Sequence, residues 1–260
     1  MLRYKNKEDL EAVFAQVDES VDKWRVRESE ASDDLRAALG NKLLISLIFH
    51  DAALEGEVLS HGEIKAAIDS NIISDASLIP SYEEISNFHQ AALHGFGLAN
   101  KKNAASVDTL RDIRKLLLPD EEGGPSYRKE NPLHRLYYHE ISAPAKIPTL
   151  VKELEAWLSG EEAASIHPVN RAATAHFKVM SIFPWAKQTG RAARIFANMM
   201  LLGTGYPIAV IHSIDRQRYY ESLRTGNQSQ LLSVYLEAVK TTADSAVRVY
   251  DEAANGRRAS

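Results

Sequence analysis

The residues best suited to chemistry lie in one loop between two apolar helical stretches. The loop reads FPWAKQTGR, and it places Gly190, Arg191 and Arg194 at the start of the second helix. Backbone N–H groups at a helix N-terminus attract anions, and arginine offers forked donors that match phosphate oxygens. The pattern therefore indicates an anion site. A helical hairpin whose arginines are solvated or pair with acids is the simpler interpretation of these features alone.

Other side chains offer little further chemistry. Cysteine is absent, which excludes disulfides and thiolate sites. His89 and His94 are five residues apart, as are His134 and His139, whereas a helical metal site uses positions i and i+4. We therefore expect no metal site.

Composition bounds the class of protein. The chain has 260 residues, of which 45% are hydrophobic and 25% charged, so it can form one large domain or one domain with a helical extension. The net charge of −4 provides no basic field for nucleic acid. The N-terminus is charged and no window approaches eighteen uninterrupted apolar residues. We expect a cytoplasmic protein with no nucleic-acid or membrane partner.

Helical periodicity covers most of the chain. Apolar spacing, capping residues and Gly or Pro breaks predict helices at about 10–17, 43–48, 60–68, 81–98, 107–118, 148–158, 167–182, 189–202, 215–224 and 228–250. The stretch 126–147 lacks this period, and its tyrosines and bounding prolines are typical of a short β-hairpin or extended flap. We expect the tail from Asn255 to be frayed.

The loop resembles the signature of the Fic (filamentation induced by cAMP) family, H-P-F-x-[D/E]-G-N-G-R-x-x-R. Aligned on it, this chain reads FPWAKQTGRAAR from Phe183 to Arg194. Segments 145–158 and 215–223 are similar to helices that flank the family core, and 127–144 falls at the family's flap. The resemblance implies an all-α, Fic-like helical fold with a short β-hairpin flap.

The same resemblance divides the chain into three parts. Residues 1–75 would form N-terminal helices that include an inhibitory helix. Residues 76–240 would form the Fic-like core, and residues 241–260 would form the end of the C-terminal helix and a tail.

Two signature positions lack the side chains that the family uses for AMP transfer. Phe183 stands where the family has its catalytic His, and a phenyl ring cannot take a proton from a target hydroxyl. Lys187 stands at the acidic position that helps to hold Mg²⁺, and a protonated Lys cannot ligate that cation. The resemblance thus implies no catalytic residue, argues against bound Mg²⁺, and argues against ordinary AMP transfer.

The anion-binding part of the signature is retained. The nucleotide- or phosphate-binding residues implied by the resemblance are Lys187, Gln188, Thr189, Gly190, Arg191, Arg194, Tyr219 and Tyr220. The expected ligand is ATP or another nucleotide, and the expected site for a protein target is the flap at 127–144. The paired tyrosines are also consistent with simple packing, with one ring inward and one outward.

An inhibitory motif also matches in part. Many Fic proteins carry [S/T]-x-x-x-E-[G/N], whose Glu pairs with the second signature Arg. Here the sequence is DAALEG, with Asp51 in place of Ser or Thr and with Glu55 and Gly56 intact. The resemblance predicts an ion pair between Glu55 and Arg194. A helix that ends at a capping Gly with an exposed Glu is the alternative.

Three functions remain open at this point. The preferred one is a regulatory protein that binds a nucleotide, phosphate or protein partner without AMP transfer. The second is a transferase with altered chemistry, in which Lys187 replaces the metal and the base comes from His176 or the substrate. The third is an interaction module. His176 is more simply a core residue, and His167 an N-terminal helix residue.

Overall fold

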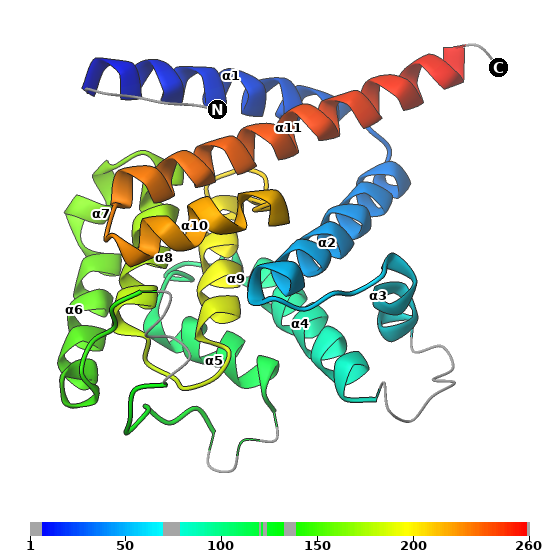
Figure 1. Ribbon diagram of the computed structural model, residues 1–260. Helices are drawn as coiled ribbons and strands as arrows, with labels where there is room; N and C mark the ends of the chain where they lie inside the picture. The colour runs from blue at the N-terminus through cyan, green and yellow to red at the C-terminus, as the bar shows by residue number, and fades with distance from the viewer. Residues whose placement is uncertain (1–6, 70–78, 120, 122–123, 133–138, 259–260) are drawn as a thin grey trace.

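The computed structural model describes residues 7–69, 79–119, 121, 124–132 and 139–258, and its regular elements are helices (Figure 1). The α-helices are α1 (Lys7–Glu30), α2 (Asp33–Glu55), α3 (His61–Ile68), α4 (Ile79–Leu98), α5 (Val107–Leu117), α6 (Ile147–Ser159), α7 (Glu161–Ser165), α8 (Pro168–Ile182), α9 (Thr189–Leu202), α10 (Arg216–Arg224) and α11 (Gln228–Arg258). Two 3₁₀ turns, η3 (Pro144–Lys146) and η4 (Ser213–Asp215), precede α6 and α10.

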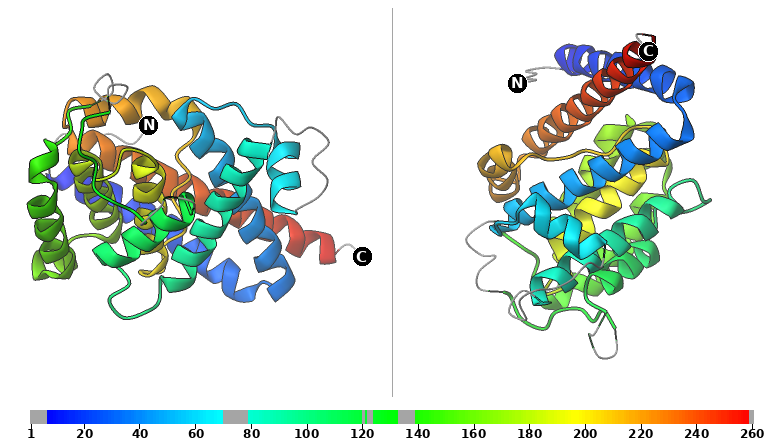
Figure 2. Two further views of the ribbon diagram at one scale, coloured as in Figure 1. Left: turned by 90° about the horizontal axis from the view of Figure 1, so that it is seen from below. Right: turned by 90° about the vertical axis from the view of Figure 1, so that its right-hand side faces the viewer.

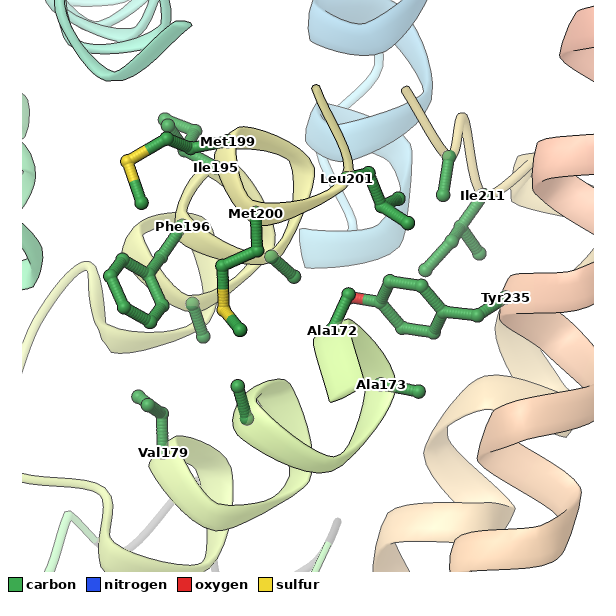
Figure 3. Packing of buried hydrophobic residues seen from close by; sticks show 14 of the residues in the cluster. Ala172, Ala173, Val179, Ile195, Phe196, Met199, Met200, Leu201, Ile211 and Tyr235 are labelled. Carbon is green, nitrogen blue, oxygen red and sulfur yellow. The ribbon is translucent and has the colours of Figure 1, made fainter. Parts of the chain in front are cut away.

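The antiparallel pair α8 and α9 forms the centre of the molecule. Every residue of α9 from Thr189 to Leu201 is buried. Alanines at 172, 173 and 175 line the buried face of α8, and these small side chains allow the two helices to approach closely. Figure 3 shows Phe196 and Met200 of α9 above α8, with Tyr235 of α11 reaching the same cluster. The loop between α8 and α9 is therefore held by two immobilised helices.

The other helices cover this pair on several sides. α4 and α5 pack against α9, α6 and α11 pack against α8, and α10 packs against α11. α1 lies along α11, away from the loop that joins α8 to α9 (Figures 1 and 2). α2 contacts α3, α4 and η4, which brings its C-terminal end to the N-terminus of α9.

Two predicted helix starts had opposite outcomes. Ser60 caps α3 and forms a reciprocal capping box with Glu63, which confirms that prediction. Ser81 was expected to cap the next helix in the same way, but α4 already begins at Ile79 and Ser81 lies inside it. A proline at position 80 fits the first helical turn, where its missing N–H has no partner to lose.

The terminal helices are longer than the sequence indicated. α1 continues through the charged interval to Glu30, α2 starts at Asp33 behind the N-cap Ser32, and α11 continues through Arg258. Apolar periodicity missed these turns because their charged faces are solvated. One contact that supports the extension is the ion pair between Arg27 Nε and Asp251, at 2.7 Å.

No strand occurs in the described parts of 127–144. Residues 124–132 and 139–143 are irregular, and 133–138 lie outside the described residues. The hairpin predicted there is therefore not seen. Two backbone hydrogen bonds fix the segments that enter and leave this region: Arg128 N donates to Pro184 O and Ser142 N donates to Ser181 O, both at 2.9 Å.

α2 is the one helix within the described ranges that is long and apolar enough to cross a membrane by length and composition. In this structure seven of its residues are buried against protein, among them Asp51. A charged, buried residue near its end indicates a polar contact rather than apolar packing there.

Candidate anion-binding site

The loop between α8 and α9 has a defined shape built from two unusual backbone positions. Phe183 caps α8 with φ of 47°, and Gln188 precedes α9 with φ of 63°, so both occupy the left-handed region. The Thr189 hydroxyl donates to Trp185 O at 2.8 Å and accepts from Trp185 N at 3.2 Å. These bonds close the loop at the N-terminus of α9.

Two buried arginines that the sequence interpretation did not single out hold the loop through its carbonyl groups. Arg128 Nε donates to Phe183 O at 2.6 Å, and Arg114 Nε donates to Lys187 O at 2.7 Å. Arg114 also pairs with Glu121 at 2.8 Å, and burial lowers its pKa. Because these hydrogen bonds are made to backbone carbonyl groups, they do not depend on the side chains at positions 183 and 187.

A sequence signal for Arg114 existed. It occupies a position on the buried face of α5, beside Leu110, Ile113 and Leu117. A charged residue in an apolar helical register indicates a buried partner. Arg128 lies in the irregular segment, where no periodicity marks a buried position.

Arg191, the first signature arginine, is surrounded by three carboxylates. Its Nε donates to Asp51 at 3.2 Å, its Nη2 to Glu57 at 2.6 Å and its Nη1 to Glu84 at 3.1 Å. Burial acts to lower the pKa of Arg191, but Asp51 and Glu57 outweigh it and the net pKa is raised. The guanidinium is thus permanently charged and already neutralised from within.

Arg194, the second signature arginine, is buried more deeply. Its Nη2 donates to Glu55 at 2.7 Å, its Nη1 donates to the Tyr219 hydroxyl at 3.2 Å, and its Nε donates to Asp51. The predicted contact between Glu55 and Arg194 is therefore confirmed. Asp51, Glu57 and Glu84 were not predicted as partners of the two arginines.

Gly190 explains how Glu55 reaches this position. A Cβ atom at residue 190 would lie 2.8 Å from Glu55 Oε1 and 3.1 Å from Arg194 Nη1. Real Cβ atoms do not approach oxygen so closely, so only glycine leaves room for the carboxylate against the first turn of α9. The N-terminus of α9 thus holds an anion that belongs to the chain itself.

The expected adenine pocket is closed in this arrangement. Tyr219 is fully buried, and its hydroxyl is hydrogen-bonded to His176 Nε2 at 2.9 Å and accepts from Arg194 Nη1. Tyr220 is also buried, with the Arg216 guanidinium 5.1 Å from its ring centroid. Neither ring presents a free face for a base to stack on.

His176 is a core residue, as the simpler interpretation held. It is fully buried, and burial together with Arg194 lowers its pKa to about 3. A group with so low a pKa is a weak proton acceptor near neutral pH. His167 caps α8, as expected for an N-terminal helix residue, and its Nε2 lies 3.1 Å from Asp18.

The two altered signature positions lie in different surroundings. Phe183 is buried, with its ring against that of His139 at a centroid distance of 5.8 Å. Lys187 is exposed and lies at the edge of a cavity of about 820 Å³ that Arg114, Tyr127 and Lys129 also line. Within the described ranges, no group of three or more His, Asp and Glu is placed to hold a metal.

Comparison with solved structures identifies the class of protein. A Fic-domain-containing signaling protein from Bacteroides thetaiotaomicron superposes with a TM-score of 0.78 at 19% identity, covering 91% of this chain and 98% of its own. Fic-1 from C. elegans superposes with a TM-score of 0.73 at 22% identity, covering 94% of this chain and 71% of its own. The chain has the all-α Fic fold.

Part of the sequence matches a known family. Residues 104–201 match the Fic/DOC family, and they include α8, the loop and most of α9. The matched part is 98 of the 260 residues and contains both Arg191 and Arg194.

Curated proteins with Fic in their names are similar to this chain. The protein adenylyltransferase Fic of Drosophila virilis is 28% identical over 207 residues, which are 78% of this chain and 41% of that protein. The protein of the same name from Culex quinquefasciatus is 27% identical over 192 residues, which are 72% of this chain and 38% of that protein. This chain spans about two fifths of the length of these relatives.

Proposed function

We propose that this protein is a degenerate Fic protein that binds a nucleotide or polyphosphate in a regulatory role and does not transfer AMP. The observation that carries the proposal is the Glu55 carboxylate against Gly190 and Arg194. A site that holds an internal anion has the charge and geometry to hold an external one when that carboxylate moves away.

The loop geometry supports ligand binding apart from catalysis. Arg114 and Arg128 fix the loop through carbonyl groups, and Thr189 closes it through the Trp185 backbone. The anion site thus keeps its shape although Phe183 has no proton to exchange. Losing a general base costs roughly two to four orders of magnitude in rate, which removes useful transfer.

The altered-chemistry alternative lacks support from the site. His176 would have to supply the base, yet its Nε2 is taken by the Tyr219 hydroxyl inside the core. The relatives named protein adenylyltransferase motivate a test for transfer, because ATP is the substrate that their name implies.

A protein partner is part of the proposal. A Fic domain named IbpAFic2, which superposes with a TM-score of 0.51 at 17% identity, was solved in complex with adenylylated Cdc42. We propose that the surface around 127–132 and Lys187 serves this chain for a protein contact. The cavity of about 820 Å³ between them offers room for a side chain.

One observation favours the interaction-module alternative. Every guanidinium nitrogen of Arg191 and Arg194 has an acceptor within the chain, so the cluster also joins α2 and α4 to α9 as a structural network. The internal carboxylates must therefore be removed from the arginines before ligand binding is measured.

The experiment compares wild type with a variant carrying Asp51→Ser and Glu55→Ala. Equilibrium dialysis with labelled ATP and with tripolyphosphate should give binding by the variant and much weaker binding by wild type. Neither protein should transfer label to itself or to lysate proteins, with or without Mg²⁺. No binding by the variant at millimolar ligand would favour the interaction module, and Mg²⁺-dependent labelling would favour the transferase.

A further inference from the structure

We infer that Asp51 is a second inhibitory carboxylate, and that the site opens only when Asp51 and Glu55 withdraw together. This inference rests on the proposed function, because it concerns how the same anion site is kept closed. It also restricts the ligand to one that carries several adjacent negative charges.

Asp51 lies between the two arginines. Its side chain is 2% exposed, and its two oxygens accept from Arg191 Nε and from Arg194 Nε. One carboxylate therefore bridges both signature arginines. Glu55 accepts from Arg194 Nη2, and its side chain is 12% exposed.

Glu55 and Asp51 hold different guanidinium nitrogens of the two arginines. If Glu55 leaves, Arg194 Nη2 becomes available, while Asp51 keeps Arg194 Nε and Tyr219 keeps Arg194 Nη1. Arg191 keeps its hydrogen bonds to Asp51, Glu57 and Glu84, and it loses only the longer-range attraction of the Glu55 charge. Removing Glu55 alone thus frees one donor of six.

The outer acids, Glu57 and Glu84, are weaker partners of Arg191 than Asp51 is. Glu57 and Glu84 are 43% and 51% exposed, so solvent and salt weaken their interaction with Arg191. Asp51 is buried and therefore shielded from solvent and salt, so its attraction to the two guanidinium groups is stronger than that of Glu57 or Glu84. The closed state therefore depends on Asp51 and much less on the outer acids.

Asp51 and Glu55 are also mechanically linked. They are four residues apart on α2 and face the same direction, so they move as one unit with the helix end. α2 stops at Gly56, whose φ of 92° turns the chain so that Glu57 reaches Arg191. Withdrawal of the last turn of α2 would free Arg191 Nε together with Arg194 Nε and Nη2.

The charge balance defines the ligand. Asp51, Glu55, Glu57 and Glu84 supply four negative charges against the two positive charges of Arg191 and Arg194, a net −2. A single phosphate would be repelled by this negative excess and could accept from only a few of the guanidinium N–H groups. A polyphosphate chain can replace both inner carboxylates at once, because neighbouring phosphoryl groups can address two neighbouring arginines.

The experiment measures the affinity of ATP, tripolyphosphate and inorganic phosphate for four proteins by equilibrium dialysis. These are wild type, Glu55→Ala, Asp51→Ser and the variant with both changes. We expect Glu55→Ala to tighten tripolyphosphate binding by less than about threefold and the double variant by about thirtyfold or more, with little binding of phosphate. Glu83→Gln is the matched control, because it removes one negative charge from an exposed position next to Glu84 on α4, and it should change affinity by less than about twofold.

Two outcomes separate the inference from the proposed function. If Glu55→Ala alone binds as tightly as the double variant, Asp51 is no second lock, while the anion site itself stands. If the double variant is folded and binds nothing, the proposed function fails and the inference fails with it. Asp51→Asn with Glu55→Ala keeps the volume and the hydrogen-bond acceptor, and it replaces the Ser variant if circular dichroism shows that the latter does not fold.

Discussion

At the level of single residues, the site depends on a glycine that has no side chain and on a carboxylate that uses the space. Gly190 permits Glu55 to lie against the first turn of α9, where it accepts from Arg194 Nη2. Sequence alone could predict this pair, because both residues belong to known motif positions. It could not predict that Asp51 bridges the two arginines, since that contact depends on how α2 docks on α9.

Gly190→Ala should therefore weaken the contact between Glu55 and Arg194. The added methyl would meet Glu55 Oε1 at 2.8 Å, so the carboxylate must move, and we expect a loss of about 1–3 kcal/mol in unfolding free energy. Urea unfolding of the variant measures this loss. The same substitution in a Glu55→Ala background should cost clearly less, and an equal cost in both backgrounds would show that the methyl strains something else.

At the level of elements, most helices follow from apolar spacing, and the loop geometry does not. The bounds of α3, α5, α6, α8 and α9 lie within two residues of those the sequence indicated. Solvated helical turns in α1, α2 and α11 escaped notice because they bury few residues. The contacts of Arg114 and Arg128 with the loop were not predicted, because they join segments that are far apart in the sequence.

Arg114→Met should loosen the loop without unfolding α5. The substitution removes the donor to Lys187 O and leaves Glu121 without its cation, at a cost of about 1–3 kcal/mol. Hydrogen exchange at 184–189 should become faster than in wild type.

Arg111→Met provides the control for this prediction, because it lies one turn earlier on the same helix. Arg111 is 42% exposed, pairs with Asp108 at 3.5 Å and donates to the Tyr127 hydroxyl at 3.2 Å. Neither partner belongs to the loop, so its loss should cost at most about 1 kcal/mol and leave exchange in the loop unchanged. Equal exchange rates in the two variants would mean that Arg114 does not hold the loop.

At the level of the whole molecule, the buried His176 and the half-buried His50 join separate parts of the fold in their neutral form. His176 of α8 contacts Tyr219 of α10, and His50 of α2 stacks on His212 before η4 with a centroid distance of 4.3 Å. Burial lowers the pKa of His176 to about 3, with Arg194 adding to the effect. Burial, followed by the neighbouring His212, lowers the pKa of His50 to about 4. Both pairs join the chain segments that enclose the two signature arginines.

These lowered pKa values predict that acid destabilises the fold well above the range in which carboxylates titrate. Between the ordinary histidine value of 6.5 and the folded values, the unfolded chain binds protons that the folded chain does not, so stability falls as pH drops through this window. For a fully buried histidine the loss between pH 6.5 and 5 is about 2 kcal/mol.

Urea midpoints at pH 7, 6 and 5 should therefore decline for wild type. The decline should be shallower for His176→Gln, whose amide can still accept from Tyr219, and unchanged for His94→Gln, because His94 is exposed. An equal decline in wild type and His176→Gln would show that His176 does not carry the acid sensitivity, and would assign it to groups outside the contact between α8 and α10.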